Sequence, residues 1–154
     1  MLHIGWAERY GYSPDKERLK EESLREVRRR LATVLALDPR PLGDPRPLEN
    51  RVLGTCRDFS VLLCCTLRSQ GVPARVRCGF GAYFERARYW DHWVCEYFNA
   101  MFGTWVLVDA QIDDFQRRTV GIEFDTLDLP RGQFISGGIG LLGSLAFLGV
   151  ITLE

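Results

Sequence analysis

The alternation of hydrophobic and polar positions predicts helices in the first half of the chain and strands in the second. Residues 16–35 carry one apolar stripe and are otherwise charged, which is typical of a helix that covers one face of a core. Residues 56–68 are apolar on nearly all sides, so we expect them to form the buried central helix. After Gly71 the period changes to two, and residues 74–80, 91–98 and 104–110 are expected to be strands. The pattern predicts an α+β fold with an antiparallel sheet, a central helix and additional N-terminal helices.

Two further segments differ from this pattern. Residues 38–51 nearly duplicate a hexapeptide and hold four of the seven prolines, so we expect a stiff, extended surface connection. Residues 132–154 are apolar and glycine-rich, and 22 of them in a row are uncharged, close to the roughly 20 that a membrane helix needs. The glycines and the lack of flanking basic residues favour an altered or truncated C-terminus, folded as a buried strand or disordered, over a membrane tail.

We therefore treat residues 1–154 as a single domain, with a helical part (1–37), the proline-rich connection (38–51), a core (52–115) and the apolar tail (132–154). Residues 1–12 have the pattern of a helix already under way, so we expect a segment to precede them. Within this part His3 has no acidic or nucleophilic partner nearby in the sequence, and we interpret it as structural.

Charge and cysteine content exclude several classes of function. Twenty basic and twenty acidic side chains cancel, which gives no electrostatic basis for binding nucleic acid or an anionic membrane. The basic run Arg28–Arg30 is interpreted as a solvated helix face. Five cysteines without a Cys-x-x-Cys pair argue against a disulfide framework and a zinc ribbon. Free thiols and the lack of a secretory pattern predict a cytoplasmic protein.

Cys56 is the first candidate for chemistry, because it stands at the start of the predicted central helix. Thr55 can cap that helix, and Asp58 is placed to reach back as in a capping box. A helix N-terminus carries partial positive charge and unpaired N–H groups, which stabilise a thiolate. A cysteine in a helix is nevertheless more often an inert core residue, so a partner is needed.

His92 and Asp109 provide that partner if the second and third strands form a hairpin. Pairing Tyr97 with Thr104 across the turn places His92 directly opposite Asp109. A carboxylate there fixes the tautomer of the imidazole and raises its basicity. A slip of one residue would put the two side chains on opposite faces of the sheet. Cys56, His92 and Asp109 then supply the nucleophile, the base and the orienting group of a thiol-dependent acyl transfer.

Other residues are weaker candidates for this site. The N–H of Cys56 can stabilise an oxyanion, and Asn50 is a weak candidate for the second donor. Among the aromatic residues of the loop after the first strand, we expect Tyr83 and Trp90 to contact the substrate. A zinc site from Cys78, His92 and Cys95 would need side chains from both faces of one strand, and the pair Asp113–Asp114 is too small for calcium. We therefore expect no metal and no cofactor, and interpret the four remaining cysteines as small core residues.

Four blocks of sequence resemble the transglutaminase-like superfamily, most of all its bacterial transglutaminase-like domain proteins. They are residues 54–59 (Gly-Thr-Cys-Arg-Asp-Phe), 67–75, 91–94 (Asp-His-Trp-Val) and 105–109 (Trp-Val-Leu-Val-Asp). The resemblance implies a papain-like core whose cysteine opens a helix packed on an antiparallel sheet. It gives Cys56, His92 and Asp109 the roles of nucleophile, base and orienter.

The implied activity is acyl transfer from an amide, by a cysteine peptidase or amidase or by a transglutaminase-type enzyme. Water is slightly favoured over a lysine amine as the acceptor, because nothing in the sequence marks an amine site. The expected partner is a protein or peptide amide substrate, with no nucleic acid and no membrane, although the apolar tail leaves a membrane open. A non-catalytic interaction module that keeps the three residues for packing is the alternative. The sequence leaves the oligomeric state open.

Overall fold

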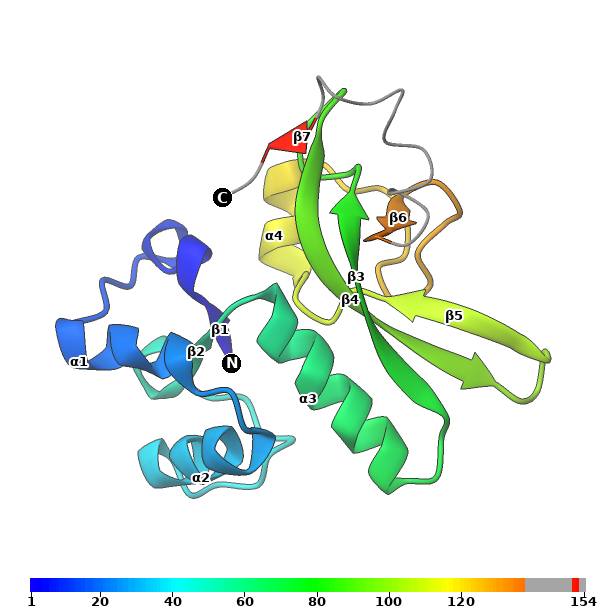
Figure 1. Cartoon of the computed structure of the whole chain (residues 1–154). Helices are drawn as coiled ribbons and strands as arrows, with labels where there is room; N and C mark the ends of the chain where they lie inside the picture. Colours follow the sequence, from blue (N-terminus) through cyan, green and yellow to red (C-terminus); the bar gives the residue numbers. More distant parts are fainter. Residues whose placement is uncertain (138–150, 153–154) are drawn as a thin grey trace.

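A curved, mainly antiparallel sheet with one long helix against it forms the centre of the molecule (Figure 1). The computed structural model describes residues 1–137 and 151–152 of the chain. The sheet has the strand order β5–β4–β3–β6, and β7 pairs in parallel with β4. Its strands are β3 (Ala74–Gly81), β4 (Tyr89–Asn99), β5 (Thr104–Val108), β6 (Phe134–Ser136) and β7 (Ile151–Thr152). The predicted α+β class is confirmed.

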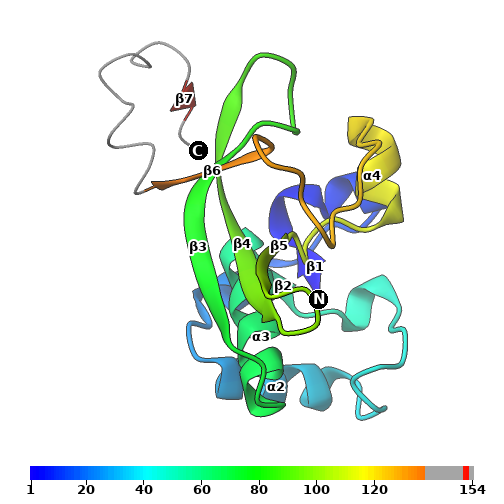
Figure 2. The same cartoon turned by 90° about the vertical axis from the view of Figure 1, so that its right-hand side faces the viewer.

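Helix α3 (Cys56–Ser69) packs against β3 and β4, and α2 (Val27–Leu37) packs against α3 from the other side. Three strand pairs of this sheet, β3–β4, β4–β5 and β3–β6, are antiparallel, and Figure 2 shows β3 and β4 as long curved strands. Helix α3 is less enclosed than its apolar sequence predicts. Cys64 is buried, but Cys65 on the next position is exposed, because only one side of the helix meets the sheet.

The two faces of the sheet hold separate parts of the core. Cys95 of β4 packs with Cys64 of α3 in a cluster that fills the space between sheet and helix. Val94, the neighbouring residue on β4, packs in a second cluster, and alternate residues of a strand point to opposite faces. That second cluster also contains Tyr83, Ile112, Ile122, Leu129 and Phe134. Residues after β5 therefore cover the sheet face opposite α3.

Helix α4 (Asp114–Val120) follows β5 and was not predicted. The Asp113 carboxylate caps it by accepting from the Gln116 N–H, and Gly121 ends it in a left-handed conformation. The predicted helix over residues 16–35 is also wrong, because it is three elements, α1 (Lys16–Leu19), η3 (Lys20–Ser23) and α2. Leu24 is extended between η3 and α2, and its carbonyl accepts a hydrogen bond from Arg30.

The remaining N-terminal elements are short. They are η1 (Ile4–Trp6), η2 (Glu8–Tyr10), η4 (Leu48–Asn50) and the parallel bridge between β1 (Leu2–His3) and β2 (Leu53–Gly54). This bridge places His3 beside Gly54, two residues before Cys56. The start of the chain is thus fixed next to the start of α3.

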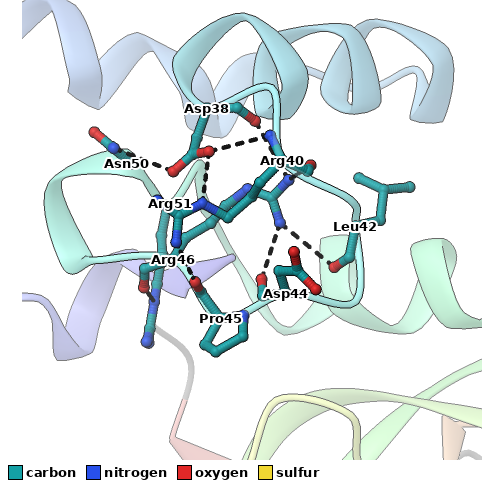
Figure 3. A network of polar contacts seen from close by, with 8 residues as sticks. All are labelled: Asp38, Arg40, Leu42, Asp44, Pro45, Arg46, Asn50 and Arg51. Carbon is teal, nitrogen blue, oxygen red and sulfur yellow. Dashed lines mark hydrogen bonds and ion pairs between the residues drawn. The ribbon is translucent and has the colours of Figure 1, made fainter.

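The proline-rich segment 38–51 is folded back on itself, so the prediction of an extended connection is wrong. Figure 3 shows its arginines turned inward onto the segment's own carbonyl groups. Arg46 is buried and its two terminal nitrogens donate to the carbonyls of four residues, Asp38, Arg40, Leu42 and Asp44. Prolines remove backbone donors, so side-chain donors take over the hydrogen bonding that folds this loop.

Of the apolar tail, the structure describes residues 132–137 and 151–152. Within them, Phe134–Ser136 pairs with β3 and Ile151–Thr152 with β4. The predictions for the rest of the tail concern residues outside the described part. Within the described residues, no helix has both the length and the apolar character to cross a membrane.

Candidate active site

His92 and Asp109 form a buried pair, with the imidazole Nε2 at 2.8 Å from the carboxylate Oδ2. Their exposed fractions are 3% and 1%, so both side chains are almost completely buried. Burial alone would lower the pKa of His92, but the adjacent Asp109 carboxylate outweighs it and raises that pKa to about 10. Burial likewise opposes the Asp109 carboxylate, and the charge of His92 nevertheless holds its pKa below the usual value. The arrangement favours imidazolium and carboxylate together.

The strand register that brings the pair together differs from the predicted one. Tyr97 pairs with Val106, two residues further along than predicted, and Asn99 pairs with Thr104. Continuing this ladder places Asp109 opposite Val94 and diagonal to His92. A slip of two residues keeps every side chain on its face, and diagonal neighbours remain within reach of longer side chains. The directly opposed geometry is therefore wrong, while the contact itself forms.

Asp109 is held from three further directions. The Tyr83 hydroxyl donates to Oδ2 at 2.7 Å, and the Gln111 N–H donates to Oδ1 at 3.0 Å. The backbone N–H of Asp109 itself donates to the Thr126 carbonyl at 2.8 Å. Because His92 also contacts Oδ2, both carboxylate oxygens have donors. These hydrogen bonds offset the free-energy cost of burying the charge in an apolar core.

Cys56 is the first residue of α3, and its side chain lies close enough to His92 to contribute to the raised pKa of the imidazole. Because Nε2 of the imidazole faces Asp109, Nδ1 is the ring nitrogen left for the thiol. The Cys56 side chain is half-buried, whereas the side chains of His92 and Asp109 are almost fully buried. Within the described residues, the Cys56 N–H makes no hydrogen bond, as expected for the first N–H of a helix.

The start of α3 is fixed by a buried ion pair that the sequence analysis missed. Arg30 Nη2 lies 3.0 Å from Asp58 Oδ1, and both side chains are 2% exposed. Asp58 also accepts from the Thr55 N–H at 2.9 Å, while Arg30 donates to the Leu53 carbonyl at 2.7 Å. The interpretation of Arg28–Arg30 as a solvated face is therefore wrong for Arg30. The helical spacing that turns Arg30 to the side of Val27 and Val34 is the signal that could have revealed it.

The aromatic residues after β3 pack onto the imidazole. The rings of Phe84 and His92 meet edge to face with centroids 4.8 Å apart, and Tyr83 makes a similar contact at 6.0 Å. Gly81 allows this packing, since a Cβ there would lie 2.9 Å from Phe84. Trp90 is on β4, two residues before His92 and opposite Gly81. The substrate-binding roles of Tyr83 and Trp90 stay predictions.

Other candidates have different positions from those expected. The Asn50 amide donates to the Asp38 carboxylate at 3.3 Å, so it belongs to the folded 38–51 segment and does not serve as an oxyanion donor. Cys95, like Cys64, is buried as predicted, whereas Cys78, like Cys65, is exposed. The His3 ring stacks on Phe59 of α3, and burial together with the charge of His92 lowers its pKa to about 4.

Comparison with known proteins agrees with this arrangement. The family model of the transglutaminase-like superfamily matches residues 7–110, which is more than half of the chain and includes Cys56, His92 and Asp109. Searches of curated proteins and of solved structures found no match. The chain belongs to the transglutaminase-like superfamily.

Proposed function

We propose that this protein is a thiol-dependent acyl-transfer enzyme that acts on amide bonds. Cys56 is the nucleophile, His92 the general acid and base, and Asp109 the orienting group. The observation that carries the proposal is the half-buried Cys56 at the start of α3, close enough to His92 to help raise its pKa, with the imidazole bonded in turn to the buried Asp109 carboxylate. An interaction module has no need of a buried histidine whose pKa is raised above neutrality beside a cysteine.

The reaction starts from a thiolate and an imidazolium. The Cys56 sulfur attacks the amide carbonyl carbon, and the oxyanion that forms is stabilised by the free N–H of Cys56. The imidazolium then gives its proton to the leaving nitrogen as the C–N bond breaks, which releases the amine and leaves a thioester on Cys56. Water attacks the thioester, His92 takes its proton, and the acid is released with the thiolate restored. We favour water over an amine as the acceptor.

The first experiment measures iodoacetamide alkylation of each cysteine against pH, by mass spectrometry of the native protein. The exposed Cys65 serves as the internal reference thiol. We expect Cys56 to react at a pH well below that at which Cys65 reacts, because an imidazolium next to a thiol favours the thiolate. In His92→Ala, the alkylation curve of Cys56 should move toward that of Cys65. A Cys56 that reacts only when the protein unfolds would overturn the proposal and favour a non-catalytic module.

Turnover is tested with peptides that carry a glutamine amide, with and without an added primary amine. Release of ammonia without amine incorporation identifies hydrolysis, and incorporation identifies transamidation. Cys56→Ala should abolish either activity and leave the circular dichroism spectrum unchanged, whereas Cys65→Ala should retain it. Full turnover in Cys56→Ala would refute the assignment of the nucleophile.

A further inference from the structure

Two consecutive residues at the start of α3 meet two consecutive residues of β4. Cys56 lies close to His92, and the guanidinium carbon of Arg57 lies 6.0 Å from the centre of the Trp93 ring. The hydroxyl of Ser60, one turn along α3, donates to the Trp93 carbonyl at 2.8 Å and fixes this contact between helix and strand. The Arg57 side chain therefore extends from α3 toward the strand that carries the histidine of the candidate active site.

The Arg57 guanidinium has spare hydrogen-bonding capacity. Its side chain is 31% exposed, and its buried Nη1 is turned to Asp58 Oδ1 at 3.5 Å. Within the described residues, none of its three nitrogens makes a hydrogen bond. A guanidinium has five N–H donors in a planar fork that matches the geometry of a carboxylate. Nε and Nη2 are therefore the nitrogens left for a ligand.

The start of α3 has one positive charge more than its partners compensate. Arg30 and Arg57 both approach Asp58, and the shorter distance, 3.0 Å, belongs to the buried Arg30. Glu21, which also acts on Arg30, is bound by Arg18 at 2.5 Å. Within the described part of the chain, Asp58 is the one carboxylate within 4.0 Å of Arg57. One carboxylate does not neutralise two guanidinium groups, so an anion is favoured beside the exposed Arg57.

An exposed carboxylate of β4 acts in the opposite direction. Asp91 is two residues before Trp93 and therefore on the same face of the strand. Two residues of a strand span about 7 Å, so Asp91 is farther from Arg57 than a bound anion would be. Its negative charge opposes an anion near Cys56. Removing the charge of Arg57 and removing that of Asp91 should thus have effects of opposite sign on any anion that reaches the thiol.

We propose that Arg57 binds a carboxylate of the substrate, so that Cys56 acts on amides with an acidic group close to the carbonyl carbon. This inference rests on the proposed function, because it names the class of substrate for the same nucleophile. Adjacent residues have Cα atoms about 3.8 Å apart, and an arginine side chain reaches beyond a cysteine side chain. A carboxylate within a few bonds of the attacked carbon therefore lies within reach of Arg57.

Alkylation of Cys56 with paired reagents tests the inference without a known substrate. The thiolate displaces iodide from iodoacetate or from iodoacetamide, and the first reagent has a carboxylate where the second has a neutral amide. The ratio of the two rate constants measures the preference for a carboxylate, and the exposed Cys65 gives the reference ratio. A second pair, 3-maleimidopropanoate and N-propylmaleimide, places the carboxylate farther from the sulfur. The neutral reagent of each pair shows whether Cys56 stays accessible in a variant.

Four variants assign the preference to one residue. The His92 imidazolium also attracts a carboxylate, so the ratios at Cys56 are compared between variants. In Arg57→Met the ratio should fall about three- to tenfold, the effect of a charge about 6 Å away at an effective dielectric constant of about 40–80. Arg57→Lys keeps the charge and should keep most of the ratio. Asp91→Asn should raise it, and Arg29→Met, with a 72% exposed side chain on α2, should leave it unchanged.

Three results would overturn the inference. If Arg57→Met keeps the ratio of the unaltered protein with both reagent pairs, Arg57 does not bind the carboxylate, although a Cys56 that is alkylated at low pH would still support the proposed function. If Arg57→Lys loses as much as Arg57→Met, the positive charge is not the cause. If Cys56 reacts with neither neutral reagent in the native protein, the proposed function fails and this inference fails with it.

Discussion

Replacing Arg30 by methionine is the sharpest test of how the Cys56 helix is held. Arg30 connects three elements: it pairs with Asp58 of α3 at 3.0 Å and donates to the Leu53 carbonyl at 2.7 Å and the Leu24 carbonyl at 2.6 Å. Methionine is of similar length and apolar, so it fills the space but makes none of these bonds. The Asp58 carboxylate then stays buried with the N–H and hydroxyl of Thr55 as donors, at 2.9 and 3.2 Å, and with the Arg57 guanidinium at 3.5 Å.

The magnitude follows from the burial of the pair. Removing one partner of a buried ion pair costs about 3–5 kcal/mol when the other charge is left without compensation. Arg57, 3.5 Å from Asp58, keeps part of the compensation, so we expect the lower end, about 3 kcal/mol. In a domain of this size, 1 kcal/mol corresponds to about 2–4 °C in melting temperature, so the expected loss is roughly 6–12 °C. Arg29→Met is the matched control. Arg29 lies next in the sequence, with its side chain 72% exposed and 3.5 Å from Glu26, so it should cost less than about 1 kcal/mol.

Urea unfolding of the two variants and of Arg30→Met/Asp58→Asn decides the matter. The double variant removes the orphaned charge and keeps an acceptor for the Thr55 N–H, so it should recover part of the stability lost in the single variant. The reasoning is refuted if Arg30→Met and Arg29→Met have the same free energy of unfolding. The single variant Asp58→Asn is measured in the same way. The reasoning is also refuted if the double variant loses as much stability as Arg30→Met and Asp58→Asn lose together.

Three further predictions concern the pair of His92 and Asp109 and the strand beside it. Tyr83→Phe removes a hydrogen-bond donor from the buried Asp109 carboxylate, so it should cost about 1.5–3 kcal/mol of stability and lower kcat with little change in KM. The control is Tyr97→Phe, since the Tyr97 hydroxyl has no hydrogen bond among the described residues. It should change neither the stability nor kcat. Because the pKa of His92 is raised from 6.5 to about 10, its contribution to stability is complete below pH 6.5 and is lost as the pH rises through 10. The difference in melting temperature between the unaltered protein and His92→Gln should therefore shrink over that range, and a constant difference would contradict the assignment. Gly79→Ala places a Cβ 2.1 Å from the Ile135 carbonyl oxygen, so it should separate β3 from β6 and lower the free energy of unfolding by at least about 1–3 kcal/mol. The control is Gly43→Ala, whose Cβ meets nothing within 4 Å and should leave thermal unfolding unchanged.

The local patterns of the sequence were sufficient for the central elements and for the pairing of His92 with Asp109. Cap residues at Thr55 and Asp58 fix where α3 begins, and that is a property of neighbouring positions. His92 and Asp109 stay on the same face of the sheet as long as the strand register shifts by an even number of residues. The register is out by two residues, because β4 continues to Asn99 and the turn before Thr104 is two residues shorter than predicted, a difference that leaves no signal in the hydrophobic pattern.

Long-range polar contacts were beyond the reach of the sequence. Arg30 and Asp58 are 28 positions apart, and although helical spacing places Arg30 on the side of Val34, nothing in the sequence identifies Asp58 as its partner. The 38–51 segment has the composition of an extended linker, yet the buried Arg46 folds it by donating to its own carbonyls. Charged residues are usually interpreted as exposed, and a buried charge is identified only by the partners that compensate it.

Residues beyond the family match complete the candidate active site. The match ends at residue 110, but the Asp109 carboxylate is held by the Gln111 N–H and the Asp109 N–H is held by the Thr126 carbonyl. The Leu129 N–H donates to the Leu107 carbonyl and so ties the same segment to β5. The carboxylate orients the imidazole only if its own position is fixed, because a misplacement of about 1 Å is enough to impair catalysis. The segment after β5 therefore holds the carboxylate that contacts His92, and sequence changes there should alter the geometry of the proposed triad without touching any of its three residues.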